Sequence, residues 1–250
     1  ANIFTEDHAA LTGAREVVIA ENLLPERSWN GNLNYTRKFY PGRIGYLGVD
    51  GSLFYTYFSN QILPDYDTDP DKIIYKNLRG YAVSTGLSIN LDVNFLNGVK
   101  LIAGATAMDV FRQEAGIRQP QLFAPPLSGT WTLTWPIPTW KCTIDYTGNL
   151  NSPMPLPVQP NDPRPDRSPW FSIHNLQITK QINRQLECYL GVKNVFGFYP
   201  KGDIILRAFD PFDKKTNENN PLGLTFDPTY NYAPIQRQRL LIGLRYQLKT

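Results

Sequence analysis

The residue types that build metal centres and covalent cross-links are scarce in this sequence. It contains two cysteines, Cys142 and Cys188, and two histidines, His8 and His174. Two cysteines are too few for a disulfide framework, and two histidines exclude a multi-histidine metal site. A Ser172–His174 pair two residues apart on one strand is not a hydrolytic triad, and no G-x-S-x-G elbow is present. The sequence therefore indicates no catalytic residue and no metal ligand.

Strong charge imbalance and long apolar runs are also absent. The chain has 25 Lys and Arg against 22 Asp and Glu, a net charge of +3, so no basic footprint for nucleic acid exists. No apolar run approaches the ~18 residues of a membrane helix, and no basic-then-apolar leader is present. The mean hydropathy of −0.35 excludes a helical membrane protein. It leaves open a membrane barrel, whose strands are apolar on one face only.

Aromatic residues and a two-residue period are what the sequence has in quantity. It contains 14 Tyr and 13 Phe, which favour strands. In residues 80–95, GYAVSTGLSINLDVNF, seven of the eight odd positions are large and apolar, and every even position is small or polar. A period of two over this length predicts a strand with one apolar and one wet face. Strands in soluble proteins are usually about 5–6 residues long, so the length favours an outer-membrane barrel.

The same alternation recurs along the chain and predicts an all-β protein. The nine predicted strands are 27–40, 44–60, 78–95, 99–112, 127–136, 140–151, 170–181, 185–196 and 235–248. Segments 27–40, 127–136 and 170–181 alternate less cleanly than the others. Segment 99–112 is ambiguous, because Ala103, Ala105 and Ala107 fit either face.

The connections between these strands alternate in length. Short links at 41–43, 96–98, 137–139 and 182–184 alternate with long links at 61–77, 113–126, 152–169 and 197–234. Outer-membrane barrels have this arrangement, with short periplasmic turns and long extracellular loops. The first and last strands then run inward, and residues 1–26 belong to an extracellular loop. Single-chain bacterial barrels have an even number of strands, so nine strands predict part of a larger barrel, unless one strand was overlooked.

One long link, PDYDTDPDKIIYKNLRG at 64–80, has the spacing of a calcium loop. Asp65, Asp67, Asp69 and Asp71 occupy every second position. An EF-hand loop needs a glycine at position 6 and a glutamate at position 12, and here Pro70 and Lys76 stand there. The stretch is therefore predicted to be a hydrated extracellular loop rather than an EF-hand. Whether its four aspartates bind calcium in another way is left open.

Several segments resemble one family of membrane proteins. They are residues 2–36, with the pattern L-x-P-E-x-S-x-N from Leu24 to Asn30; residues 62–86; residues 186–200, with GVKNVF; and the closing strand 239–248. In this order they resemble the C-terminal barrel of TonB-dependent outer-membrane receptors, in the form common in the Bacteroidota. That family usually ends on an aromatic residue read by the barrel-assembly machinery, whereas here Tyr246 is followed by Leu248, Lys249 and Thr250.

The resemblance implies that residues 1–250 are the C-terminal part of an antiparallel transmembrane β-barrel of about 22 strands in the cell outer membrane. The N-terminal plug domain and the earlier strands would lie outside these residues. The implied activity is active import of a scarce nutrient (ferric siderophore, cobalamin, another metal chelate, or glycan or peptide), with no enzymatic activity and no cofactor.

The implied partners are TonB–ExbB–ExbD through the N-terminal part, outer-membrane lipid and lipopolysaccharide, the barrel-assembly machinery, and a surface lipoprotein in relatives that carry a lid. No nucleic-acid partner is implied, and nothing in these strands selects the substrate or the oligomeric state. The alternatives are a passive porin or structural barrel without TonB coupling, and a soluble β-sandwich binding module.

Individual residues and one segment carry four further predictions. The polar candidates for the barrel lumen are Asp50, Asn90, Asp92, Asn94, Asp145, Asn149, Glu187 and Lys193, placed to contact a plug or line a hydrated interior.

Cys142 and Cys188 lie on strands separated by another strand, about 10 Å apart, and are predicted to be free thiols. Trp135 and Trp140 flank a turn, and Trp29, Trp131 and Trp170 lie on other strands. Tryptophan usually packs in a core, but placement beside turns favours a position at the membrane interface. The proline-rich stretch 152–169 is predicted to be a stiff, extended loop.

Overall fold

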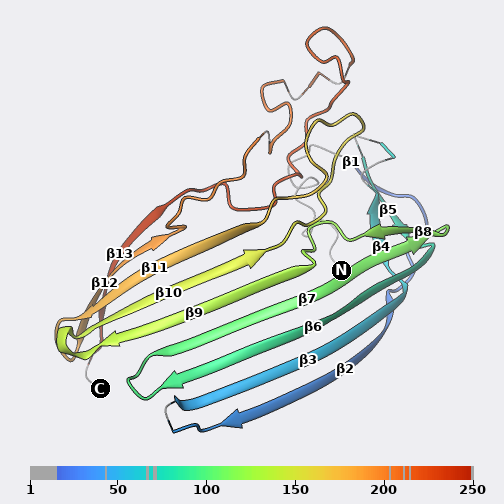
Figure 1. Ribbon diagram of the computed structural model, residues 1–250. Coiled ribbons are helices and arrows are strands. Elements are labelled where there is room, and N and C mark those ends of the chain that lie inside the picture. Colours follow the sequence, from blue (N-terminus) through green and yellow to red (C-terminus); the bar gives the residue numbers. More distant parts are fainter. Residues whose placement is uncertain are drawn as a thin grey trace.

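A computed structural model describes residues 16–42, 44–65, 68–69, 72–202, 204–210, 212–213 and 215–248. Its main element is one antiparallel sheet of nine long strands in the order β13-β12-β11-β10-β9-β7-β6-β3-β2 (Figure 1). The strands are β2 (Arg27–Phe39), β3 (Ile44–Asn60), β6 (Gly80–Phe95), β7 (Lys100–Glu114), β9 (Leu127–Ile137), β10 (Cys142–Asn151), β11 (Phe171–Gln181), β12 (Leu186–Lys193) and β13 (Arg239–Tyr246). All nine predicted strands are confirmed; the largest shift of an end is at β13, predicted as 235–248.

The register places like residues in rows across the sheet. One row runs through all nine strands: Phe39, Leu47, Val93, Leu101, Leu133, Tyr146, Leu176, Val192 and Leu240. Because side chains alternate between the faces of a strand, every row an even number of residues away lies on the same side. We call this side the apolar face and the opposite side the polar face.

The register of β7 with its neighbouring strands decides which face its alanines occupy. Ala103 lies between Leu91 and Trp131 in register, and Ala107 lies between Leu87 and Leu127. The alanines of β7 therefore belong to the apolar face. The alternation of β7 was too weak to decide this, because alanine is compatible with either environment.

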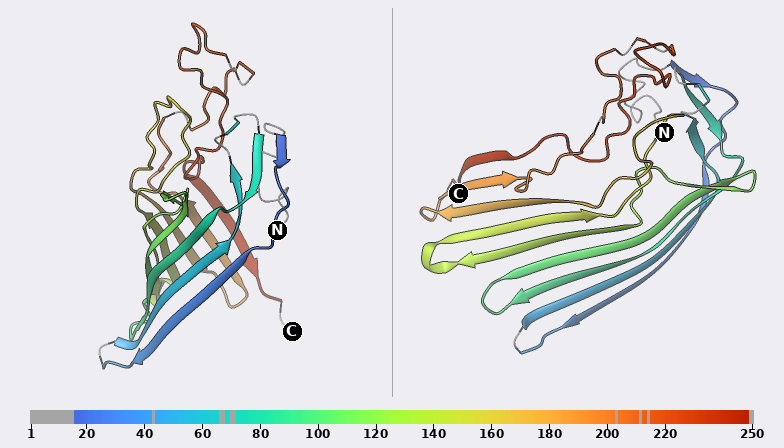
Figure 2. Two further views of the ribbon diagram at one scale, coloured as in Figure 1. Left: turned by 90° about the vertical axis from the view of Figure 1, so that its right-hand side faces the viewer. Right: turned by 45° about the horizontal axis from the view of Figure 1, so that its top comes forward.

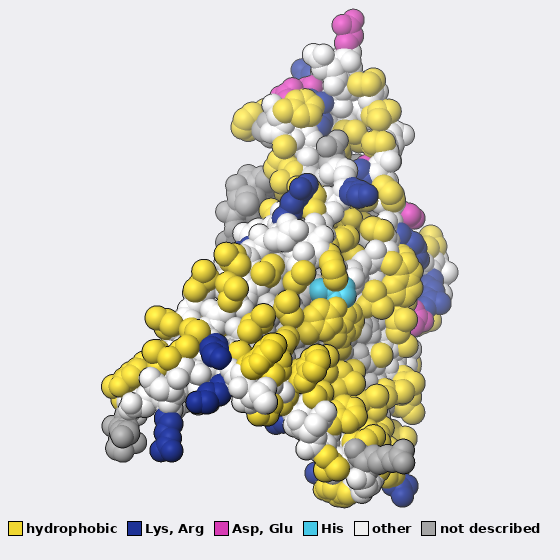
Figure 3. Space-filling view, turned by 60° about the vertical axis from the view of Figure 1, so that its left-hand side comes forward, with side chains coloured by type: hydrophobic (Ala, Val, Ile, Leu, Met, Phe, Trp, Pro, Cys, Tyr) yellow, Lys and Arg dark blue, Asp and Glu magenta, His cyan; other side chains and the backbone are white. Residues whose placement is uncertain are grey.

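The sheet is curved like an open trough rather than flat (Figure 2). Hydrophobic side chains cover much of its surface in the view of Figure 3. Many large apolar side chains of this face are exposed, among them Leu33, Leu53, Ile89, Leu190 and Ile242. Soluble proteins rarely expose a continuous apolar patch of this extent, so the face requires an apolar surrounding.

The two ends of the sheet differ, as the link lengths predict. Connections 40–43, 96–99, 138–141 and 182–185 join strands at one end, which we call the turn end. Connections 61–79, 115–126, 152–170 and 194–238 lie at the other, which we call the loop end (Figure 1). The C-terminus lies at the turn end (Figure 1).

Four short strands were not predicted. They are β1 (Glu16–Ile19), β4 (Ile62–Asp65), β5 (Lys72–Asn77) and β8 (Ile117–Pro120). A separate three-stranded sheet has the order β1-β5-β4, in which β4 and β5 form an antiparallel pair and β1 joins in parallel. The long link 61–77 is therefore partly a hairpin. Its strands were missed because they are short and their pairing partner β1 is distant in the sequence.

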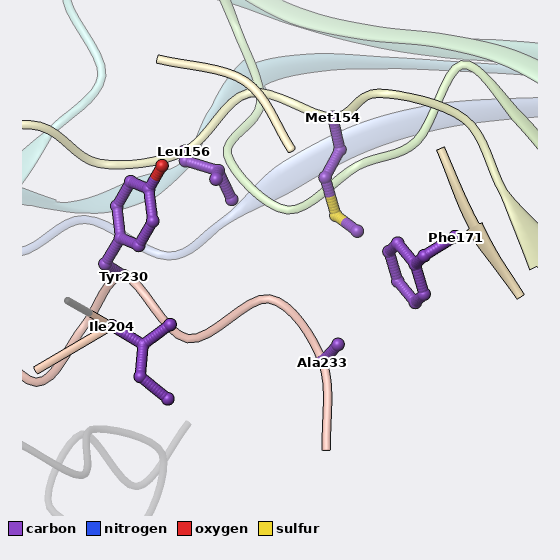
Figure 4. Close-up of a cluster of buried hydrophobic side chains, with 6 residues drawn as sticks. All are labelled: Met154, Leu156, Phe171, Ile204, Tyr230 and Ala233. Carbon is purple, nitrogen blue, oxygen red and sulfur yellow. The ribbon is translucent and has the colours of Figure 1, made fainter. Parts of the chain in front are cut away.

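The connections 152–170 and 194–238 pack together into what we call the two-loop unit. Its hydrophobic cluster consists of Met154, Leu156, Ile204, Tyr230 and Ala233 of the two connections, together with Phe171 at the start of β11 (Figure 4). An antiparallel bridge joins Pro155 to Arg167, so the proline-rich segment turns back on itself. The prediction of a stiff, extended loop is therefore wrong: the prolines limit backbone freedom, but contacts with a distant connection decide the shape.

Among the described residues, no helix has the length and hydropathy needed to cross a membrane. Both described cysteines are free, as predicted. Cys142 and Cys188 lie in one row on either side of Lys180, so a whole strand separates them.

Candidate functional site: the polar face and the loop end

The register brings all eight predicted lumen residues to one side of the sheet. Asp50, Asn90, Asp92, Asn94, Asp145, Asn149, Glu187 and Lys193 all lie on the polar face, on β3, β6, β10 and β12. Asp50 and Asn90 are direct partners on neighbouring strands. Alternation alone was sufficient to assign the face, because a two-residue period fixes the direction of each side chain relative to the next.

Three carboxylates on the polar face accept hydrogen bonds from neutral side chains. The Thr36 hydroxyl donates to Asp50 at 2.6 Å, and the Thr134 hydroxyl donates to Asp145 at 2.7 Å. The Asn94 amide donates to Asp92 at 3.2 Å. Within the part of the chain that the structure describes, none of these three aspartates forms an ion pair. Their negative charges are therefore not neutralised by a cation of the described chain.

The other polar-face candidates have different roles. Glu187 pairs with Arg245 of β13 at 3.1 Å, which ties the two last strands together. The Asn149 side chain accepts a hydrogen bond from the Ile173 backbone amide at 3.1 Å. Lys193 lies opposite Arg239 in register. Glu187 and Asn149 thus hold neighbouring segments together through bonds to Arg245 and Ile173.

A row of asparagines on β2 was missed by the sequence reasoning. The Asn30 amide donates to Thr56, the Asn32 amide donates to Asn30, and Ser52 donates to Asn34. The N-x-N-x-N spacing in the sequence was the available signal. It was overlooked because the alternation of β2 is irregular on its other face. Together with the aspartates, these amides and hydroxyls make this part of the polar face a network of hydrogen-bonding groups.

Aspartates of the acidic link 64–80 form ion pairs with lysines of the same link. Asp65 pairs with Lys76 at 2.9 Å and also accepts hydrogen bonds from Thr68. Asp69 pairs with Lys72 at 3.3 Å. Lys76 is the residue at position 12 of the calcium template. Asp67 and Asp71 lie outside the described residues, so calcium binding here stays an untested prediction; among the described residues no group of metal ligands is found.

The two-loop unit is organised around a buried arginine. Arg164 lies 2.7 Å from both Asp162 and Asp227, with all three side chains at most 6% exposed. The guanidinium also lies over the ring of Tyr230, at 4.2 Å, and the Tyr230 hydroxyl donates to the Pro165 carbonyl. Asp162 and Arg164 belong to one connection, whereas Asp227 and Tyr230 belong to the other. Arg164 therefore joins the two connections.

The ion pairs of the two-loop unit shift the pKa values of Asp162 and Arg164. Burial alone would raise the pKa of Asp162, but hydrogen bonds from the Arg164 side chain and from backbone amides outweigh burial and lower it. Burial alone would lower the pKa of Arg164, and its bonds to Asp162 and Asp227 raise it. Both groups are therefore charged over the physiological pH range.

A second buried arginine organises the far part of the same unit. Arg207 is 6% exposed and donates to Asp213 at 2.8 Å and to Asp210 at 3.2 Å. In contrast, Phe209 and Phe212 beside it are 84% and 91% exposed. The arginine hydrogen bonds therefore add to the packing of the buried Leu206 and Leu224 in this stretch.

The family follows from the sequence comparison. Residues 4–195, more than three quarters of the chain, match the family described as "TonB dependent receptor-like, beta-barrel". The chain belongs to the TonB-dependent receptor family. Members of this family are outer-membrane transporters and not enzymes, and this receptor chain is an outer-membrane protein. No curated protein is similar to it in sequence.

Solved receptors share the fold of this receptor chain. The ferric-catecholate import receptor Fiu from E. coli K12 has a TM-score of 0.60 and 14% identity, over 90% of this chain and 28% of that one. The ferripyoverdine receptor from Pseudomonas aeruginosa has a TM-score of 0.61 and 16% identity, over 90% and 28%. The copper transporter OprC has a TM-score of 0.61 and 14% identity, over 94% and 34%. The receptor chain thus spans about a third of each protein.

A polar cluster around His174 lies on the apolar face of the receptor chain. His174 contacts the Tyr146 hydroxyl through Nδ1 at 2.5 Å and the Ser172 hydroxyl through Nε2 at 2.9 Å. Its ring also contacts Trp131 and Phe196. Ser172 and His174 are therefore hydrogen-bonded to each other. No carboxylate of the described chain is bonded to His174, so the arrangement is not a hydrolytic triad.

Four tryptophans of the receptor chain lie toward the ends of the sheet. Trp29 and Trp170 lie toward the loop end and Trp135 and Trp140 toward the turn end, each more than half exposed. Trp131 instead packs against Gly148 of the neighbouring strand. The exposed four are not core residues, and their placement at the membrane interface stays a prediction.

Proposed function

We propose that the chain is the C-terminal part of the barrel of an outer-membrane transporter that imports a scarce nutrient and is energised through TonB. The observation that carries the proposal is a family match combined with a sheet that is apolar on one face and polar on the other. An apolar outer face suits lipid, and a polar inner face suits a plug domain or a passing substrate.

The edges of the sheet support a larger barrel. Within the described residues, β2 and β13 each pair on one side only. An unpaired edge in hydrocarbon would leave many backbone groups without hydrogen bonds, at several kcal/mol each. We infer that these edges pair with further strands of the same protein. The solved receptors, about three times longer, are consistent with this inference.

The orientation and the partners follow the family. We place the turn end in the periplasm and the loop end, with the two-loop unit, outside the cell. TonB–ExbB–ExbD would act through a plug domain, and the barrel-assembly machinery would insert the chain. Motifs in residues 24–30 and 186–200 favour the form found in the Bacteroidota, in which a surface lipoprotein can act as a lid.

The substrate class stays wide: a ferric siderophore, cobalamin, another metal chelate, or a glycan or peptide. The solved structures with similar folds include receptors named for ferric catecholate, ferripyoverdine and copper. At this level of identity the likeness supports the fold and not the cargo.

Two measurements on the full-length protein test the proposal against a passive porin. In planar bilayers, a receptor closed by a plug should show no steady conductance, whereas a porin should show a constant open level. The purified protein should also bind the periplasmic domain of TonB. A steady conductance without TonB binding would contradict the proposal.

A further inference from the structure

Basic side chains collect at the turn end of the sheet. The described Lys and Arg residues within the segments 37–46, 94–101, 136–143, 180–187 and 243–248 are Arg37, Lys38, Lys100, Lys141, Lys180, Arg184 and Arg245, all exposed. Glu187 is the single acid in these segments. The chain as a whole has 25 basic and 22 acidic residues, so acids outnumber bases in the remainder. The charge of the protein is thus strongly asymmetric along the strands.

Most of these cations have no acidic partner. Among the described residues, Arg245 alone of the seven forms an ion pair, with Glu187. In the view of Figure 3, Lys and Arg side chains are seen at the lower ends of the molecule, where no Asp or Glu is seen. Uncompensated exposed charges of one sign attract a partner of the opposite sign.

The cations divide between the two faces. Lys38, Lys100 and Arg245 lie on the polar face, where a plug domain would meet them. Arg37 and Lys180 lie on the apolar face. Lys141 and Arg184 belong to the turns themselves.

The two cations on the apolar face are arranged as residues at a membrane surface. Lys180 lies between Cys142 and Cys188 in register, and its Nζ donates to the carbonyl oxygen of Trp140 in the adjacent turn. Its aliphatic stem thus covers the apolar face while the ammonium group reaches past the strand end. The Arg37 guanidinium lies over the Phe39 ring at 5.0 Å.

Exposed aromatics surround the same boundary. Trp140 is 67% exposed, Trp135 is 53%, and Tyr40 is 74%. Tryptophan and tyrosine favour the level of lipid headgroups, where an apolar ring meets a wet edge. The cations therefore lie where phosphate groups of a bilayer would be.

We propose that Arg37, Lys141, Lys180 and Arg184 form a docking surface for anionic phospholipid headgroups. The proposal rests on the orientation given under the proposed function, because that orientation places the turn end in the phospholipid leaflet rather than the lipopolysaccharide leaflet. Charge complementarity and continuity with the apolar face select the lipid over a protein partner.

The test compares two variants of equal charge in the full-length receptor. Arg37→Gln/Lys180→Gln/Arg184→Gln removes three cations from the apolar face and turns. Lys38→Gln/Lys100→Gln/Arg245→Gln removes three from the polar face at the same end. Each receptor is placed in nanodiscs of phosphatidylethanolamine with a minor fraction of phosphatidylglycerol, and retained lipids are measured by native mass spectrometry.

Wild type and the polar-face variant should retain phosphatidylglycerol in preference to phosphatidylethanolamine, and the first variant should lose the preference. Each cation near a membrane surface is worth about 1 kcal/mol, about fivefold in affinity, so three should give a loss on the order of a hundredfold. The preference should also weaken as salt is raised.

A third variant distinguishes the loss of cationic charge from misfolding caused by the loss of the Lys180–Trp140 contact. Arg37→Gln/Lys141→Gln/Arg184→Gln leaves the Lys180–Trp140 contact intact and should show a loss of similar size. Equal loss in the polar-face variant, no preference in wild type, or tighter binding of lipopolysaccharide than of phosphatidylglycerol would overturn the proposal. A lipid preference found in a protein that fails the TonB and conductance tests would overturn the proposed transport alone.

Discussion

The nine-stranded sheet and the two-loop unit are held together in different ways. The sheet is built from backbone ladders that repeat along every strand, so each residue contributes a similar small share. In the two-loop unit, regular pairing is limited to isolated bridges such as Leu206 with Asp227. There the contacts converge on a few side chains, chiefly Arg164 with its two aspartates.

This difference has consequences for how each region responds to change. The effect of substituting a sheet residue depends on the face it occupies, because the environment is similar along a row. The effect of substituting a residue of the two-loop unit depends on its individual partners, so a substitution at its neighbour in sequence can have no effect. The predictions below separate these two kinds of dependence.

The largest effect is expected at Arg164. Arg164→Met would leave Asp162 and Asp227 as buried carboxylates without a cation, at a cost of about 3–5 kcal/mol to the two-loop unit. Hydrogen exchange in residues 152–170 and 215–238 should become faster by a corresponding factor. Arg167→Met removes an exposed arginine of the same connection and should leave exchange unchanged. Equal protection in both variants would show that apolar packing, not the arginine, holds the unit.

A charge on the apolar face of the sheet should come next in size. Leu87→Arg places a cation on the exposed apolar face, and an arginine facing lipid near the bilayer midplane costs about 2–4 kcal/mol. Ser88→Arg, one residue along, places the same charge on the polar face and should lose about 1 kcal/mol with the Thr106 hydrogen bond. Chemical unfolding from liposomes measures both. Equal costs would contradict the assignment of the two faces.

A smaller effect is expected where an aromatic ring packs on glycine. A Cβ at Gly148 would collide with the Trp131 ring, so Gly148→Ala should cost about 1–3 kcal/mol through overpacking. Gly51 lies on the same face, and no atom lies within 4 Å of the place that a Cβ would take there. Gly51→Ala is therefore the matched control and should be nearly neutral in the same unfolding experiment.

The smallest effect should be that of lowering the pH on the stability of the two-loop unit, because no change is expected near neutral pH. Because the folded-state pKa of Asp162 is lowered, its contribution is present above the usual pKa of about 3.9 and is lost as pH falls through the folded value. Protease sensitivity of the two-loop unit should therefore stay constant from neutral pH down to about pH 5 and rise only in stronger acid. In Arg164→Met the transition should disappear, and a transition near pH 6 in wild type would rule out Asp162 as its cause.

The sheet could be predicted from the sequence because its information is local. All nine strands, the alternation of links and the common face of Asp50, Asp92 and Asp145 follow from a two-residue period. The period did not reveal the short strands β1, β4, β5 and β8, and it gave no face to the alanines of β7, which carry no preference. There the register with Leu91 and Trp131 was needed.

The loop end could not be predicted because its contacts join distant segments. Asp162 and Asp227 are far apart in the sequence, and nothing in either stretch indicates that one arginine binds both. The same holds for β1 and β5, whose pairing turns a predicted loop into a small sheet. The acidic link shows a different limit: its aspartates are plain in the sequence, but which lysine each one pairs with is decided by how the link folds.

The sequence by itself determined the nine long strands, the apolar side of most of them, and which end carries the long connections. These properties depend on the alternation of side chains about an extended backbone, which any window of the chain displays. The tertiary structure decided how the long connections fold, which cations neutralise which acids, and that uncompensated basic residues meet at the turn end. These depend on approach between segments remote in the sequence, which no local pattern records.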